Sequence, residues 1–143
     1  LKDRPAAEPP PPCRRAYDIL IPIYNAYDHV KRCVESVLRH TEPRHTVYLL
    51  DDASPDARIL PLLEEFAKAD ARVKVLPSDR NGGFIRNVNR GFRLSRRSVV
   101  ILNSDTEVTP HWLERLDRCR ESGPEVAVVS PLSTTRRSCR SPR

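Results

Sequence analysis

Three oxygen-bearing side chains, Asn103, Ser104 and Asp105, directly follow the apolar run 99–102. That run, Val-Val-Ile-Leu, has the composition of a strand buried on both faces. Amide, hydroxyl and carboxylate oxygens are ligands that hard divalent cations such as Mg²⁺ and Mn²⁺ prefer, and the same residue types also cap helices. The segment therefore predicts either a cation site at a strand end or a capped helix start, for which Thr109 is the candidate cap.

Polar clusters also follow three other apolar runs, at 24–25, 51–56 and 79–83. Asn25, Asp28 or Asp56 could simply cap a helix, and Gly82-Gly83 could simply turn the chain. The adjacent carboxylates of Asp51 and Asp52 need a stronger explanation, because like charges repel and require compensating donors or cations.

The spacing of apolar residues indicates which elements hold these clusters. Strands are expected at 17–23, 46–50, 73–76, 98–102 and 126–129, with helices over 30–38, 59–66, 85–94 and 110–120. In the helix at 85–94, the side chains of Val88, Phe92 and Leu94 are expected to face inward. Non-alternating strands separated by helices predict right-handed βαβ units, so the expected fold class is α/β: an open, mostly parallel sheet with helices on both faces. Ligands bind at the carboxyl ends of such strands, where all four clusters would share one edge.

Composition divides the chain into three parts. Residues 1–15 are Pro-rich and predict a linker or disordered arm, 16–132 form the expected domain, and 133–143 read as a basic unstructured tail. The net charge is +6, but eight of the 25 basic and two of the 19 acidic residues lie outside 16–135, which leaves 17 of each within it. A neutral body argues against nucleic acid as a partner.

Several other classes fit poorly. The chain has no apolar run of the roughly 18 residues that a membrane helix needs. Its four cysteines form no C-x-x-C pair, which favours buried or incidental thiols in a reducing compartment. A response-regulator receiver domain would require a phosphoacceptor Asp at the third strand and a Lys at the fifth. A nucleotidylyltransferase would require a Gly-rich basic loop where this chain has YNAYDHVKR.

Four segments in register resemble a known family. IPIYNAYDHVKRCVESVLRHT, LLDDASPD, NGGFIRNVNRGF and ILNSDTEVTPHWLERL are similar, in this order and spacing, to family 2 nucleotide-sugar glycosyltransferases of GT-A fold. Each motif alone is weak evidence for the family, whereas the four motifs in this order make the match specific. The resemblance covers about residues 17–132 and corresponds to the N-terminal, donor-binding half of those enzymes.

The resemblance implies a role for each matched position. An acid of the Asp51-Asp52 pair, preferably Asp52, would accept a hydrogen bond from the imide N–H of uracil or thymine. Asp105 would be the chief ligand of Mn²⁺ or Mg²⁺ on the pyrophosphate, in a variant of the D-x-D element. The nucleotide-sugar would also lie against the strand ends and the loop that precedes the third helix, at Pro22, Tyr24, Asn25, Asn81, Gly82, Gly83, Asn89, Asn103 and Ser104.

Two positions depart from the family pattern. Asn103 replaces the first Asp of D-x-D, which removes one charge from the cation site. Val88 stands where many relatives have Arg, and Arg86 is the hypothetical substitute for that phosphate contact.

The segment that would carry the general base and the acceptor cavity has no counterpart here, so the catalytic base is unknown for this chain. The resemblance implies an inverting transfer from a UDP- or dTDP-sugar to a glycan or lipid-linked acceptor, of hexosyl or rhamnosyl type. It also implies a cytoplasmic, bacterial polysaccharide-forming protein, peripheral to a membrane and part of a larger polypeptide. The alternative is a non-catalytic nucleotide-binding or interaction module.

Overall fold

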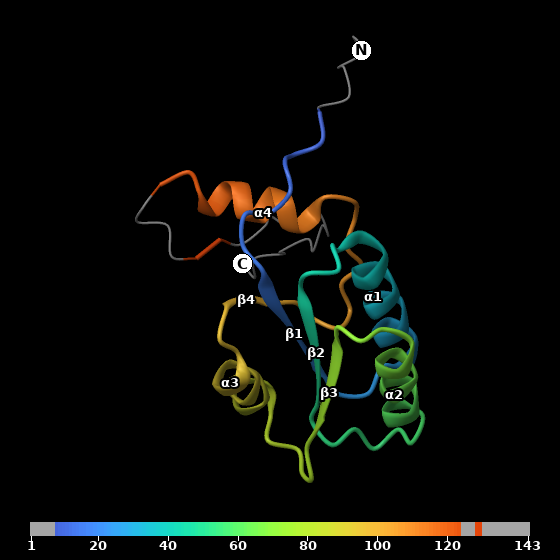
Figure 1. Cartoon of the computed structure of the whole chain (residues 1–143). Helices are drawn as coiled ribbons and strands as arrows, with labels where there is room; N and C mark the ends of the chain where they lie inside the picture. Colours follow the sequence, from blue (N-terminus) through green and yellow to red (C-terminus); the bar gives the residue numbers. More distant parts are fainter. Residues whose placement is uncertain (1–7, 124–127, 130–143) are drawn as a thin grey trace, which may run out of the picture.

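A four-stranded parallel sheet forms the centre of the molecule. The computed structural model describes residues 8–123 and 128–129, and Figure 1 shows the arrangement of its elements. The order along the chain is β1 (Tyr17–Ile23), α1 (Tyr27–His40), β2 (Thr46–Asp51), α2 (Ile59–Ala69), β3 (Val73–Pro77), α3 (Phe84–Leu94), β4 (Ser98–Ile101) and α4 (Trp112–Arg120). In space the strands follow the order β3-β2-β1-β4, all parallel. The expected α/β fold is confirmed. Of the strand expected at 126–129, residues 126–127 lie outside the described residues, and Val128 and Val129 are not part of a strand.

The central strand β1 tolerates a proline because of where its pairing ends. On one side, β1 pairs with β2 from Asp18 to Ile23, while its pairing with β4 covers only Tyr17 to Leu20. The Leu20 carbonyl accepts from Leu102 after β4, and the Ile23 carbonyl accepts from Asp52 after β2. Since backbone groups alternate along a strand, the missing N–H of Pro22 faces the β4 side, beyond the last paired residue.

One face of the sheet carries the main core. The buried stripe Val30, Cys33, Val34 and Val37 makes α1 amphipathic in the expected way. It packs with α2 on the alternating side chains of β1 and β2, among them Ile19, Ile21, Ile23, Val47 and Leu49. Leu113 brings α4 into the same core, and Figure 1 shows this helix crossing the amino-terminal ends of the strands.

The helix α3 covers the opposite face, but not in the expected orientation. Val88 is buried, as expected, while Phe92 and Leu94 are about half exposed, so their inward assignment was wrong. The buried positions are instead Asn87, Val88 and Gly91. A Cβ on Gly91 would lie 2.8 Å from Leu20 Cδ1 and 2.9 Å from Leu50 Cδ1, so the glycine allows α3 to approach the sheet closely.

The helix starts also differ from expectation. No side-chain cap is present at α1 or α4, whose N-cap residues, Ala26 and His111, have left-handed backbones. The expected caps Asn25, Asp28 and Thr109 therefore do not act as such, although Asp56 does accept from the backbone N–H of Arg58 just before α2. No helix in the described ranges is long and apolar enough to cross a membrane.

Candidate functional site

Asp52 joins two of the four polar clusters. Its Oδ1 accepts from the backbone N–H of Gly82 at 2.9 Å, and its Oδ2 accepts from that of Gly83 at 2.8 Å. The end of β2 is thereby tied to the loop that leads into α3. Only 5% of Asp52 is exposed, and the two N–H donors compensate its charge. Each carboxylate oxygen keeps a second lone pair.

Asp51 joins the same edge to the end of β1 through Ser54. The Ser54 hydroxyl donates to Asp51 Oδ1 at 2.6 Å and accepts from the backbone N–H of Asn25 at 2.9 Å. The Asn25 side-chain oxygen in turn accepts from the backbone N–H of Asp56 at 3.1 Å. Hydrogen bonds therefore join three of the four clusters that were expected to share one edge of the sheet.

This edge also concentrates left-handed backbone. Asn25, Ala26 and Ala53 have φ of 57°, 60° and 56°, and Gly83 has φ of 78°. A non-glycine residue in this region is unfavourable by about 1–2 kcal/mol. Such strain clusters at binding sites, where the surrounding structure holds it in place. Three strained non-glycine residues at one strand edge therefore support a functional role for this edge.

Arg90 is a positioning residue that the motif comparison did not single out. Its guanidinium donates to the carbonyls of Leu76 at 3.2 Å and Pro77 at 2.6 Å, and to Asn87 Oδ1 at 3.1 Å. These contacts hold α3 against the end of β3. The signal in the sequence was the spacing to Asn87 one helical turn earlier, which a purely apolar pattern does not reveal.

Other expected ligand residues are accessible. Tyr24 is 51% exposed, Asn81 and Asn89 are exposed, and Pro22 is half-buried. Arg86 lies across Gly82, where an added Cβ would meet Arg86 Cδ at 2.6 Å. It also lines a hollow beside the β3–α3 loop together with Arg80 and Arg90. Val88 is buried beneath α3 and is 5% exposed, whereas the Arg86 side chain is exposed at this edge.

The Asn103–Asp105 segment follows β4 but is not tied to the other three clusters. Asn103 and Asp105 are exposed and Ser104 is half-buried. Across the described ranges, the side chains of these three residues make no hydrogen bond. Backbone contacts place the segment near α1, since the Asn103 carbonyl accepts from the Cys33 thiol at 3.6 Å and from Thr106 N–H at 3.1 Å.

The oxygen set at this segment fits a divalent cation only in part. Within the part of the chain that the structure describes, no group of three His, Cys, Asp or Glu residues could hold a metal ion. Asp105 is one free carboxylate, with an amide and a hydroxyl beside it in sequence. Mg²⁺ commonly binds through one or two carboxylates plus substrate phosphates, and this donor set suits that mode and not a closed protein cage.

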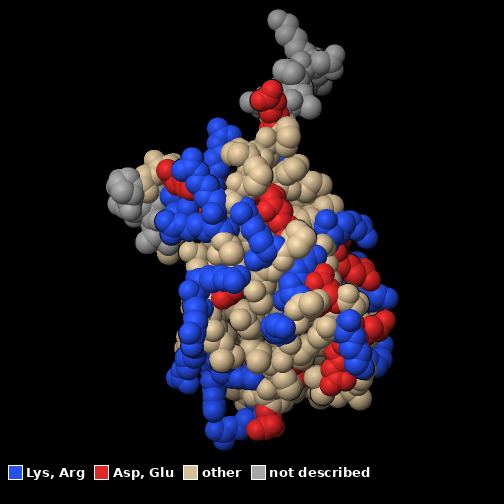
Figure 2. All heavy atoms as spheres, viewed as in Figure 1, with Lys and Arg blue, Asp and Glu red and all other residues tan. Residues whose placement is uncertain are grey.

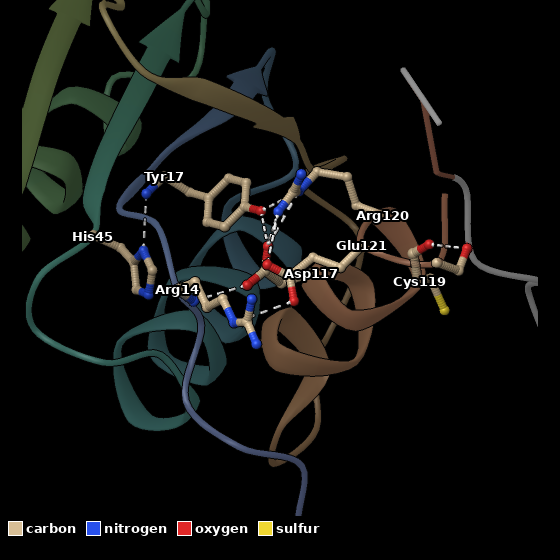
Figure 3. Close-up of polar contacts among 8 residues, drawn as sticks. Arg14, Tyr17, His45, Asp117, Cys119, Arg120 and Glu121 are labelled. Atoms are coloured by element: carbon tan, nitrogen blue, oxygen red, sulfur yellow. Dashed lines mark hydrogen bonds and ion pairs between the residues drawn. The ribbon is translucent and has the colours of Figure 1, made fainter. Parts of the chain in front are cut away.

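A second polar cluster lies at the opposite edge, at the start of β1. Figure 3 shows the Tyr17 hydroxyl and the Arg120 guanidinium both directed at Asp117, whose other oxygen accepts from the Arg14 backbone N–H at 3.0 Å. Burial alone would raise the pKa of the Asp117 carboxyl, but these hydrogen bonds lower it overall. The cluster anchors α4 and the chain before β1. It lies far along β1 from the strand ends just described, so we assign it a structural role.

Two of the three cysteines that the structure describes agree with the expectation of buried thiols. Cys13 and Cys33 are buried, and burial raises the pKa of each thiol to about 12. Cys119 is exposed on α4. Cys13 packs in the core, so the segment expected to be a linker already joins the domain at this residue.

Comparison with known proteins agrees with the resemblance. The model of the family described as glycosyl transferase family 2 matches residues 18–136. The chain belongs to this family. The match covers all eight described helices and strands apart from the first residue of β1, and therefore every polar cluster at the strand ends.

Individual relatives are moderately similar. The uncharacterized glycosyltransferase EpsJ of Bacillus subtilis is 31% identical over 99 residues, which are 68% of this chain and 28% of that protein. The succinoglycan biosynthesis protein ExoO of Rhizobium meliloti is 33% identical over 123 residues, which are 83% of this chain and 34% of that protein. This family 2 chain thus spans about a third of the length of these relatives.

A solved structure supports the fold independently. Residues 1–349 of S. aureus TarS superpose with a TM-score of 0.64 at 19% identity, over 73% of this chain and 32% of that one. At 19% identity, this similarity supports only the fold of the chain, which is an open α/β sheet with helices on both faces.

Proposed function

We propose that this chain is the donor-binding part of an inverting glycosyltransferase that takes a UDP- or dTDP-sugar. The observation that carries the proposal is the hydrogen-bonded strand edge, where Asp52 and Asp51 bring the loops after β1, β2 and β3 together. Family membership supports the reaction class, and the acceptor would be a glycan or a lipid-linked acceptor.

In this proposal the base of the nucleotide is recognised at the end of β2. Asp52 would accept from the imide N–H with a lone pair not used by Gly82 and Gly83, while Asp51 and Ser54 hold the neighbouring backbone. Pro22, Tyr24 and Asn25 would form the adjoining wall. A carboxylate selects for uracil or thymine, because the corresponding ring position of cytosine carries no N–H.

The sugar diphosphate would lie between the loop before α3 and the end of β4. Asn81, Gly82, Gly83 and Asn89 would line one side, with Arg86 as the cationic contact. Asn103, Ser104 and Asp105 would line the other side, where Asp105 would hold Mn²⁺ or Mg²⁺. The cation supplies positive charge that offsets the charge developing on the leaving diphosphate.

Isothermal titration with UDP and dTDP, each with and without Mn²⁺, tests this assignment. We expect saturable binding of both nucleotides by the wild-type chain, stronger with Mn²⁺. Asp105→Ala should abolish the Mn²⁺ dependence alone, whereas Asp52→Asn should weaken binding by about tenfold or more in both conditions, because a charge-assisted hydrogen bond contributes about 1.5–3 kcal/mol.

A matched control is Glu64→Ala, which removes one exposed carboxylate from α2, away from the strand edge. Its titration curves should equal those of the wild type. Binding that survives both Asp105→Ala and Asp52→Asn unchanged would contradict the donor-site assignment, as would a folded wild-type chain that binds neither nucleotide.

A further inference from the structure

One face of the domain is strongly basic, although residues 16–135 have no net charge. Residues 80–97 hold six of the 17 basic residues of 16–135 and none of its 17 acidic ones. This segment contains α3 and the loops on either side of it. Figure 2 shows Lys and Arg gathered along the side of the molecule where Figure 1 places α3, while both signs are mixed over α1 and α2.

Most of these arginines are not used by the fold. Arg90 holds the end of β3, and Arg97 lies 3.9 Å from Asp18. The side chains of the other four make no hydrogen bond or ion pair with any residue that the structure describes, and all are exposed: Arg80, Arg86, Arg93 and Arg96. We call these four residues the arginine face.

Apolar side chains project from the same segment. Ile85 is 75% exposed and Phe84, Phe92 and Leu94 are each about half exposed. Arg86 and Arg93 are seven residues apart, so they lie on one row of α3. Helical geometry places this row opposite the buried Asn87, Val88 and Gly91. Ile85 and Phe92 form the next row by the same spacing, so cationic and apolar side chains stand beside each other on the outward side of the helix.

We propose that the arginine face and its apolar neighbours dock this chain on an anionic lipid surface. A helix that presents Arg together with Phe, Leu and Ile binds the headgroup region by combining electrostatic attraction with shallow apolar insertion. Two of the four apolar residues are aliphatic and cannot stack on bases, which favours lipid over single-stranded nucleic acid. Docking through α3 would place the donor edge, where this helix begins, close to the membrane.

Co-sedimentation with lipid vesicles tests the proposal on the full chain. The vesicles are phosphatidylcholine alone, or a mixture with roughly one part phosphatidylglycerol to two parts phosphatidylcholine. The wild type should pellet with the mixed vesicles and stay in solution with the neutral ones, and added salt should weaken the binding because it screens exposed charges. Arg93→Gln/Arg96→Gln should lower affinity about 25-fold, at about fivefold per charge.

The matched control is Lys31→Gln/Arg39→Gln. It removes the same charge from exposed positions of α1, on the other face of the sheet, and leaves the basic residues near both chain ends in place. This control should bind nearly as well as the wild type. Equal loss in both double variants would overturn the arginine face and assign binding to net charge or to the chain ends.

The apolar contribution has its own pair of variants. Ile85→Ser should reduce the binding that remains at high salt, whereas Leu60→Ser, at an exposed position of α2, should not. Circular dichroism verifies that each variant is folded. Tighter binding to a single-stranded oligonucleotide than to mixed vesicles, lost in Arg93→Gln/Arg96→Gln, would overturn the lipid assignment and favour nucleic acid.

Discussion

Under the proposed function, Asn103 would set how strongly the donor edge holds a cation. Its side chain is exposed and makes no hydrogen bond to a described residue, so nothing in the fold requires the amide. The neighbouring Asp105 supplies one carboxylate, and cation affinity rises with the charge of the ligand set. The sequence identified these residue types as candidate ligands, but it did not predict that Asn103 and Asp105 are exposed. The spacing of apolar residues predicts strands and helices and does not predict the conformation of the loop after a strand.

We expect Asn103→Asp to tighten UDP binding in the presence of Mn²⁺, on the order of tenfold, because it adds a second carboxylate ligand. Titration of UDP into the variant and the wild type at one fixed Mn²⁺ concentration measures the difference. With EDTA in place of the metal, the variant should bind UDP no better than the wild type. Weaker binding of the variant in Mn²⁺ would show that position 103 does not act on the cation.

At the scale of elements, most of the architecture followed from apolar spacing. Val30, Cys33, Val34 and Val37 predicted the inward face of α1 correctly, since an apolar stripe of helical period has one favourable orientation on a sheet. The same reasoning failed for α3. Its contact with the sheet depends on Gly91 and on Asn87, whose amide donates to the Leu50 carbonyl at 2.6 Å.

The error at α3 has a physical cause. A glycine contributes no apolar side chain and a buried asparagine counts as polar, so the true contact face has little hydrophobic signal, whereas Phe92 and Leu94 suggest a face that does not exist. What the sequence could not supply is the close approach of the α3 backbone at Gly91 to the side chains of Leu20 and Leu50.

Gly91→Ala tests that close approach. The added methyl group would meet buried leucine side chains at distances below 3.0 Å, and overpacking of this kind costs about 1–3 kcal/mol. The higher helix propensity of alanine offsets up to about 1 kcal/mol, so the free energy of unfolding should fall by about 1–2 kcal/mol. Urea denaturation measures this change. Arg93→Ala, on the exposed side of α3, should stay within about 0.5 kcal/mol of the wild type.

Across the whole molecule, two polar networks hold opposite ends of the sheet. Asp51 and Asp52 join the carboxyl ends of β1, β2 and β3, and Asp117 with Tyr17 and Arg120 fixes α4 at the start of β1. The sequence revealed the first network, because its acids are adjacent and follow apolar runs. It did not reveal the second, since Tyr17 and Asp117 are 100 residues apart and no local pattern connects them.

His45 belongs to this second network, and it makes the stability of the molecule depend on pH. The imidazole is 1% exposed, and its Nδ1 accepts from the Tyr17 backbone N–H at 3.0 Å, a contact that requires this nitrogen to be unprotonated. Burial and the neighbouring Arg44 lower its pKa below the ordinary value of 6.5. The unfolded chain therefore takes up this proton at higher pH than the folded chain does.

This difference in pKa between the folded and unfolded states determines how stability changes with pH. Well above pH 6.5, His45 is neutral in both the folded and the unfolded state, and it contributes no pH dependence. As the pH falls through 6.5, the unfolded state gains a proton first, and the free energy of unfolding decreases. The decrease ends below the folded pKa, and each unit of pKa difference corresponds to about 1.4 kcal/mol. At lower pH, below about 4, protonation of Asp117 should destabilise the fold further, because its folded pKa is lowered.

Urea denaturation at pH 7.5 and pH 5.5 measures the His45 contribution as a difference within one protein. The wild type should be less stable at pH 5.5, and His45→Gln should be less stable than the wild type at pH 7.5 but lose most of the difference between the two pH values. His29→Gln, which removes an exposed imidazole from α1, should keep the wild-type difference. If His45→Gln retained the full difference, the pH dependence would arise elsewhere, and His45 would act in the second network as packing alone.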